Sequence, residues 1–216
     1  CEPVMMKCLA TVFLALSLAG CSTLDSINPF ASSGPKMAAL QPINASVQAR
    51  VVWRESVGKT DVYAFVPAVT GSTVYAASKD GNLIRVDDGK LAWKINAGQP
   101  LSGGVGADAN MVVVGSPKGD VLAFASADGQ PLWKAKATSE ILSPPALGEG
   151  IVVVRSGDNR LAAYDALDGK RKWFFQRPTP ALSLRVTASP VIAGKYVFAG
   201  FPGGKLIAVS TNNGAA

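Results

Sequence analysis

Few residues in this chain have side chains suited to catalysis or metal binding. Its 216 residues include three cysteines and no histidine. Histidine is the commonest general base and the commonest neutral metal ligand, so its absence removes the usual source of both functions. The acidic residues are spread along the sequence and form no cluster that would hold a metal. We therefore predict no catalytic residue, no metal site and no cofactor.

One of the cysteines, Cys21, follows a segment that is typical of exported proteins. Lys7 precedes an almost wholly apolar run over residues 8–19, which ends at the small residues Ala19 and Gly20. A basic start, a short apolar run and small residues are the parts of a secretory signal. The run is shorter than the ~20 apolar residues that a membrane-spanning helix needs. We therefore predict export, with a cleavage point beside the cysteine.

The residues Leu18-Ala19-Gly20-Cys21 resemble the lipobox of bacterial lipoproteins at every position. The resemblance implies that the Cys21 sulfur receives a diacylglyceryl group, that the chain is cut before it, and that the new amine is acylated. Several acyl chains on one residue suffice for stable membrane anchoring. The alternative is a chance cysteine beside an ordinary signal peptide. Ser22 follows the cysteine where an aspartate would favour the inner membrane, which implies the outer membrane.

These features divide the chain into three predicted parts. Residues 1–20 form a lipoprotein signal peptide, and residues 1–4 within it are interpreted as a remnant upstream of the true start. Residues 21–49 are rich in Ser, Ala, Pro and Asn without a sustained period, which predicts a flexible tether between lipid and domain. Residues 50–216 form the folded domain.

Cysteine usage and charge narrow the possible functions further. Cys1 and Cys8 leave with the signal peptide and Cys21 is lipidated, so we predict no disulfide even in an oxidising compartment. The net charge of +6 is unchanged by processing, but the charged residues are scattered. Without a basic stripe or a recognition motif, we predict no nucleic-acid partner.

From residue 50 onward the sequence repeats. The repeat is marked by tryptophans spaced 40 residues apart: Trp53, Trp93, Trp133 and Trp173. An Asp-Gly pair precedes each of the last three, with its glycine at Gly89, Gly129 and Gly169. Short β-rich runs such as STVYAAS and MVVVGS lie between the tryptophans, bounded by turn residues. Four short antiparallel strands in about 40 residues make one propeller blade, so we predict an all-β propeller with about four repeats.

When the repeats are aligned, residues at equivalent positions form columns, and each column predicts a role for its residues. We interpret the tryptophans as wedges between neighbouring blades, because even spacing distributes them around a ring and does not gather them into an aromatic ligand cage. A column in the hairpin turns favours residues that tolerate positive φ: Gly81, Gly119, Asn159 and Gly204. A column on the following strand is small except at its first member: Arg85, Ala123, Ala163 and Ala208.

The repeated segments DDGKLAWK, ADGQPLWK and LDGKRKWF are similar to the repeat of quinoprotein-type propellers. Together with the lipobox, they resemble the BamB family of outer-membrane assembly lipoproteins from Cys21 to the end of the chain. That resemblance implies an eight-bladed ring, anchored by lipid on the periplasmic face of the outer membrane. It implies a non-enzymatic scaffold that docks to the periplasmic POTRA domains of BamA, the barrel-forming subunit. Nascent outer-membrane proteins are a further implied partner, pairing with exposed strand edges.

One repeat is longer than the others. The interval from tryptophan to the matching later strand is 18 residues twice, but 23 residues after Trp173. The extra residues fall within QRPTPALSLRVTASP, and an apolar and arginine-bearing surface loop suggests a binding site. The alternative is a longer first strand tucked into the core. The resemblance implies that Leu182, Leu184 and Arg185 contact BamA, although Val186 stands where the family commonly has glycine.

The two ends of the repeat region predict an incomplete ring. The chain stops at STNNGAA inside a blade, and Trp53 has the context of a last strand without the other three. We expect apolar sheet faces to be exposed at both ends, which makes the chain poorly soluble or unstable alone. Two other functions stay open: a quinone-dependent dehydrogenase-like enzyme, and an envelope lipoprotein that binds another partner such as cell-wall glycan.

Overall fold

The computed structural model describes residues 47–177 and 188–216, and Arg50–Ala216 form one compact unit. All regular structure in these described residues is β-strand, in four antiparallel sheets that we call the first to fourth blades. The first blade contains β1 (Ala68–Thr70), β2 (Thr73–Ala77), β3 (Asn82–Asp87) and β4 (Lys90–Asn96). The second contains β5 (Gly106–Ala107), β6 (Met111–Gly115), β7 (Asp120–Ala125) and β8 (Pro131–Lys136). The third contains β9 (Ala146–Gly148), β10 (Ile151–Arg155), β11 (Arg160–Asp165) and β12 (Arg171–Gln176). The fourth contains β13 (Val191–Ala193), β14 (Tyr196–Phe201) and β15 (Lys205–Ser210).

Within each blade, strands that follow one another in the sequence are also neighbours in the sheet. The turn between the second and third strands needs a backbone that most residues avoid. Its predicted column has positive φ throughout, at 88° for Gly81, 82° for Gly119, 61° for Asn159 and 69° for Gly204. Glycine adopts this conformation without a steric penalty, and asparagine tolerates it better than most residues. The prediction for this column is confirmed.

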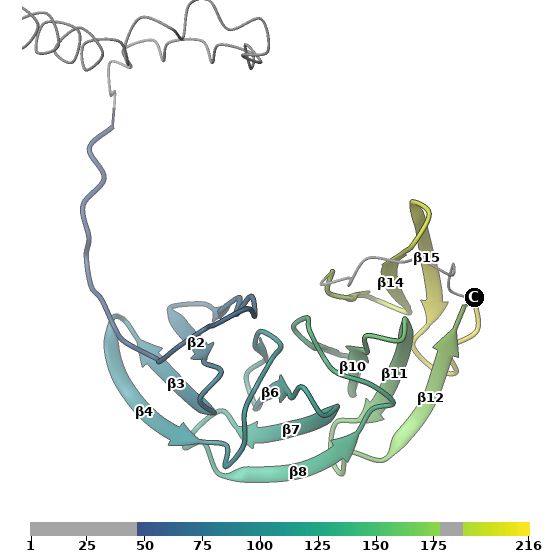
Figure 1. Ribbon diagram of the computed structural model, residues 1–216, viewed down its shortest axis with the longest axis horizontal. Helices are drawn as coiled ribbons and strands as arrows, with labels where there is room; N and C mark the ends of the chain where they lie inside the picture. Colours follow the sequence, from purple (N-terminus) through teal and green to yellow (C-terminus); the bar gives the residue numbers. More distant parts are fainter. Residues whose placement is uncertain (1–46, 178–187) are drawn as a thin grey trace, which may run out of the picture. The chain divides into compact units, whose positions relative to one another are not determined.

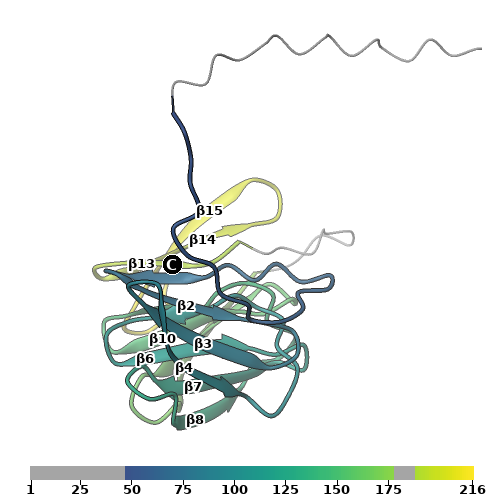
Figure 2. The same cartoon turned by 90° about the vertical axis from the view of Figure 1, so that its left-hand side faces the viewer.

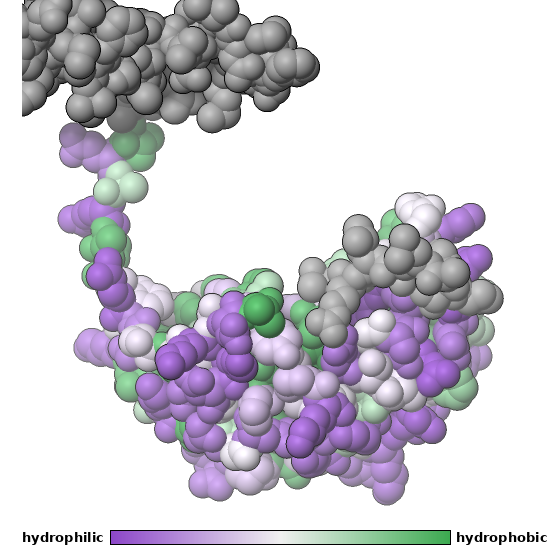
Figure 3. Space-filling model, in the orientation of Figure 1, coloured by the Kyte–Doolittle hydropathy of each residue, from purple (hydrophilic) through white to green (hydrophobic). Residues whose placement is uncertain are grey.

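The blades follow one another along an arc (Figure 1). Their first strands β1, β5, β9 and β13 contact one another in succession, while β4, β8 and β12 lie on the outer side. Figure 2 views the arc from the side of the first blade, where β2, β3 and β4 lie side by side. Hydrophilic residues predominate on the outer side of the arc in Figure 3. The repeated unit of the sequence is therefore one blade, as predicted.

The hydrophobic core lies in the seams between blades. Strand β6 contributes to two seams, because its successive side chains point to opposite faces of the sheet. Val112 and Val114 pack with the first blade, whereas Met111 and Val113 pack with the third. Strand β10 behaves in the same way, which explains why MVVVG and IVVVR are continuous apolar runs without alternation.

The two ends of the repeat region differ, which corrects one prediction. On the outward face of the first blade, Ile84 and Val86 are buried. The segment 53–61 runs along this blade: Asn82 Nδ2 donates to the carbonyl of Val57 at 3.0 Å, and Lys79 N donates to the carbonyl of Lys59 at 2.8 Å. The prediction that apolar sheet faces are exposed at both ends is therefore only partly right. The outward face of the fourth blade is the open one.

The last-type strand predicted at Trp53 is wrong, because residues 51–60 form no strand. A strand needs a neighbour with which to pair, and no described strand pairs with this segment. Trp53 instead lies beside Gly89, and 43% of its surface is exposed. It takes the position of the other tryptophans without the strand that carries them.

Candidate functional site

Each seam between blades is closed by a tryptophan from one blade and a turn glycine from the next, preceded by aspartate in the first two seams and by Asn213 in the third. A Cβ atom added at Gly169 would lie 2.6 Å from Cε3 of Trp133, and one added at Gly129 would lie 3.3 Å from Cε3 of Trp93. Gly214 stands in the same relation to Trp173, at 2.7 Å. These glycines also have positive φ, so any side chain there would be both strained and obstructed.

The indole nitrogens of these tryptophans tie neighbouring blades together. Nε1 of Trp93 donates to the carbonyl of Ser126 at 3.0 Å, and Nε1 of Trp133 donates to that of Ala166 at 2.9 Å. Trp173 donates to Thr211 in the same way, at 2.8 Å. Trp53 makes no such bond to the described residues. The three strand-borne tryptophans are therefore seam residues whose rings and donors are both used, and the structure does not gather them into one pocket.

Arg85, the exception in the column of small residues, also serves the first seam. Its Nη1 donates to the same Ser126 carbonyl at 2.8 Å, and its Nε donates to Asp87 at 2.9 Å. The hydrogen bond from Arg85 Nε, together with one from Thr73, holds the pKa of the Asp87 carboxyl below its usual value. The Ser126 carbonyl therefore accepts hydrogen bonds from both the Arg85 guanidinium and the Trp93 indole.

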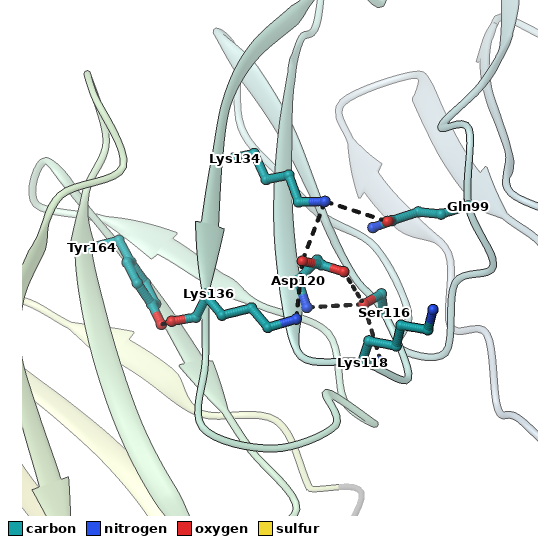
Figure 4. Close-up of polar contacts among 7 residues, drawn as sticks. All are labelled: Gln99, Ser116, Lys118, Asp120, Lys134, Lys136 and Tyr164. Atoms are coloured by element: carbon teal, nitrogen blue, oxygen red, sulfur yellow. Dashed lines mark hydrogen bonds and ion pairs between the residues drawn. The ribbon is translucent and has the colours of Figure 1, made fainter.

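A polar cluster lies in the second blade around Asp120 (Figure 4). Its carboxylate is 3.3 Å from Nζ of Lys134 and 3.2 Å from Nζ of Lys136, and it accepts a hydrogen bond from Ser116 Oγ at 3.1 Å. Lys134 also donates to Oε1 of Gln99 at 3.4 Å. Burial acts to raise the pKa of Asp120, but the three hydrogen bonds together outweigh it and lower the pKa. A carboxylate held ionised in this way is a poor proton donor at neutral pH.

Within residues 47–177 and 188–216, no group of three or more His, Cys, Asp or Glu could hold a metal ion. The same residues contain no helix long and apolar enough to cross a membrane.

The connections from one blade to the next are themselves part of the seams. Segments 97–105 and 137–145 each bury one apolar side chain completely, Leu101 and Ile141, at 0% exposure. The first segment also binds the second blade, because Ser102 N donates to the carbonyl of Gly115 at 3.0 Å. Ile141 packs directly over Gly115, where an added Cβ would lie 2.4 Å from its Cγ2.

Arg155 occupies in the third blade the position that Gly115 occupies in the second. It ends β10 as Gly115 ends β6, and only 2% of its surface is exposed. Its Nη1 donates to the carbonyl of Gly200 in the fourth blade, its Nη2 donates to Asn159 Oδ1 at 2.9 Å, and its guanidinium lies 5.0 Å from the centre of the Phe201 ring. Burial lowers the pKa of Arg155. Sequence reasoning missed this residue, although an arginine ending the apolar run IVVVR was a visible signal.

The predicted lipidation and docking residues lie outside the described part of the chain. These are Cys21, Leu182, Leu184 and Arg185, together with the departure at Val186. The third connection runs from the end of β12 to the start of β13, over residues 177–190, and is five residues longer than its two counterparts. Its described ends therefore locate the insertion in the fold, at the third seam.

The chain matches the model of one protein family over residues 79–216, and that family is described as outer membrane protein assembly factor BamB. A curated relative with that name from Bordetella pertussis is 41% identical over 201 residues, covering 92% of this chain and 51% of the relative. The chain spans about half the length of the curated relatives it matches.

Solved structures agree with this assignment. The crystal structure of BamB from Moraxella catarrhalis superposes with a TM-score of 0.68 at 26% identity, covering 76% of this chain and 50% of that one. A quinohemoprotein alcohol dehydrogenase from Pseudomonas putida superposes with a TM-score of 0.56 at 17% identity, covering 74% and 33%. The second likeness reflects the fold alone, whereas the first agrees with the family match and confirms the predicted propeller. The family match and these relatives agree with the repeat and the seams, and they show that the chain belongs to the BamB family of outer membrane protein assembly factors.

Proposed function

We propose that this protein is a non-enzymatic scaffold for outer-membrane protein assembly, and that it docks to its partner through the connection at the third seam. The names of its relatives support the assembly role. The single observation that carries the docking site is the buried guanidinium at the third seam, where Arg155 ends β10 in place of the glycine that ends β6.

The argument for docking begins with the two regular connections. Each contributes a buried side chain to a seam, and Ser102 N donates to the carbonyl of Gly115. At the third seam, the equivalent carbonyl belongs to Gly200 and already accepts a hydrogen bond from Arg155. Ile141 packs over a glycine in the second seam, whereas a connection of the regular kind would here meet the buried guanidinium of Arg155. This favours a projecting loop over the alternative that residues 181–184 form a longer first strand in the core.

The register of the blades also bears on Val186. Gly106, Ala146 and Val191 pair with equivalent positions on the second strands of their blades. Counting back five residues from each gives Leu101, Ile141 and Val186. Val186 thus aligns in the repeat with two apolar residues, so the repeat does not require a glycine at that position. The five inserted residues then precede Val186 and include Leu182, Leu184 and Arg185, the proposed contacts.

The setting of the scaffold completes the proposal. Lipidation at Cys21 would anchor the protein on the periplasmic face of the outer membrane, with residues 21–49 as a tether. The partner would be the periplasmic POTRA domains of a BamA-like barrel assembly subunit. The outer strands β4, β8 and β12 are paired on one side only among the described strands, so nascent outer-membrane strands could add to their edges. No observation on the described residues favours the quinone-dependent enzyme.

A pull-down with the purified periplasmic domains of the cognate barrel subunit tests the proposal. We expect the wild-type protein to be retained and both Arg185→Glu and Leu184→Asp to be lost, because charge reversal and a buried carboxylate each remove a central interface contact. Lys172→Glu, on the exposed side of the same blade, is the matched control and should bind as the wild type does. Circular dichroism verifies folding. Failure of the wild type to bind, or equal binding by both loop variants, would contradict the proposal.

A further inference from the structure

The outer part of the second seam contains a small cavity of about 290 Å³ between the second and third blades. Its walls include Ala162 and Tyr164 of β11, Phe174 of β12, and Ala137 just after β8. Tyr164 is held in place, because its hydroxyl donates to the carbonyl of Lys136 at 2.9 Å (Figure 4). The walls are therefore mainly apolar, and at least one of them is fixed.

The same place in the first seam is filled. The repeat aligns Ala162 with Leu122, and Phe174 with Lys134. Leu122 packs into the core of the first seam, and Lys134 reaches across it to Gln99 and back to Asp120. In the second seam, a smaller alanine leaves space, and the phenylalanine that replaces the lysine is 58% exposed. The cavity therefore results from particular substitutions and not from the blade architecture.

The rim of the cavity is cationic. Arg171 lies 5.7 Å from the centre of the Phe174 ring and forms no ion pair with any described residue. Arg160, on the neighbouring strand β11, is 3.4 Å from Asp158 and donates to Gln176 at 2.9 Å, so its charge is partly satisfied. A guanidinium stacked on an aromatic ring keeps its planar edge available for a carboxylate.

We propose that this cavity binds an extended acidic peptide, with an aromatic side chain in the apolar space and a neighbouring carboxylate on Arg171. The volume is near the lower limit of small-molecule sites, which range from about 300 to 1,000 Å³, and suits one side chain better than a cofactor. The exposed Phe174 ring offers a stacking surface, and aromatic pairs are favoured in that geometry. Charge complementarity selects an acidic partner over a basic one. This proposal rests on residues of the second seam and does not depend on the docking proposal.

Fluorescence anisotropy with the full chain and the fluorescein-labelled peptide GSDFDSG tests this proposal. We expect saturable binding by the wild type and at least about tenfold weaker binding by Arg171→Gln, because one charge-assisted contact is lost. Ala162→Leu installs the residue of the first seam and should abolish binding by filling the cavity. Lys172→Gln changes the net charge equally but lies on the next residue, where its Nζ faces Asp165 at 3.4 Å, and should leave binding unchanged.

The peptide GSKFKSG, with lysines in place of the acids, is the matched probe and should bind at least about tenfold more weakly. Thermal melts verify that each variant is folded. If Ala162→Leu is not folded, Phe174→Lys takes its place, since the first seam accommodates lysine at that position. The proposal is overturned if the wild type shows no saturable binding, if the folded cavity variants bind as tightly as the wild type, or if GSKFKSG binds equally well.

Discussion

The second and fourth blades have similar apolar strands but different surroundings. In the second blade, β6 is buried on both faces, since the first blade covers Val112 and the third covers Val113. In the fourth blade, Val197 is buried against the third, whereas Tyr196 on the opposite face is 53% exposed. The residue types differ little between the two strands. Whether a strand is buried therefore depends on which neighbouring blades are present, and each blade has two apolar faces that neighbouring blades can cover.

This difference leaves an apolar surface on the fourth blade. Val191, Tyr196 and Leu206 on its outward face are all more than half exposed, and Leu206 reaches 74%. Phe198 lies on the same face, paired with Val191 and Ala208. Contiguous exposed apolar residues of this kind mark surfaces that associate with other protein.

Introducing a charge at equivalent positions of the two blades should give the largest contrast. Val113 and Phe198 both pair with the first strand of their blade, but only Val113 is buried on its face. Val113→Asp should lose about 4 kcal/mol or more of unfolding free energy, because it buries an unpaired carboxylate. Phe198→Asp should lose less, about 1 to 2 kcal/mol, because its ring is only partly buried. Urea denaturation followed by tryptophan fluorescence measures both, and equal losses would refute the comparison.

Removing the indole rings should produce the next largest effect. Trp133→Ala should cost about 3 to 5 kcal/mol, since it deletes a seam side chain together with its hydrogen bond to Ala166. Trp53→Ala should cost about 1 kcal/mol or less, because that ring is 43% exposed and makes no such bond to the described residues. Differential scanning calorimetry of the two variants provides the measurement. A loss at Trp53 as large as that at Trp133 would show that the segment 53–61 is a full part of the first blade.

Making the open face polar should change association more than stability. Leu206→Ser, alone or with Tyr196→Ser, should alter the unfolding free energy by no more than about 0.5 kcal/mol per site. It should also reduce the concentration-dependent self-association that the apolar face of the wild type predicts. Sedimentation velocity over a range of concentrations measures the effect. A wild-type chain that is monomeric and melts sharply and reversibly would count against an aggregation-prone face.

Much of the fold could be read from local sequence signals. The turn glycines and Asn159 report positive φ, and the Asp-Gly pairs mark turns beside three of the four tryptophans, because such geometry is accessible to few residues. The absence of a strand at Trp53 could not be read in this way. Its context matches the other tryptophans, but strand formation depends on a pairing partner that local sequence does not specify.

The sequence by itself determined the repeat, the blade, the turn positions and the family, because these depend on local conformational preference and on spacing. The tertiary structure alone decided which faces are covered, that Arg155 is buried in the third seam, and that Ala162 opens a cavity where Leu122 closes one. These features depend on contacts between residues of different blades, which are distant in the sequence. Only folding brings those residues together, so the same apolar strand is core in one blade and surface in another.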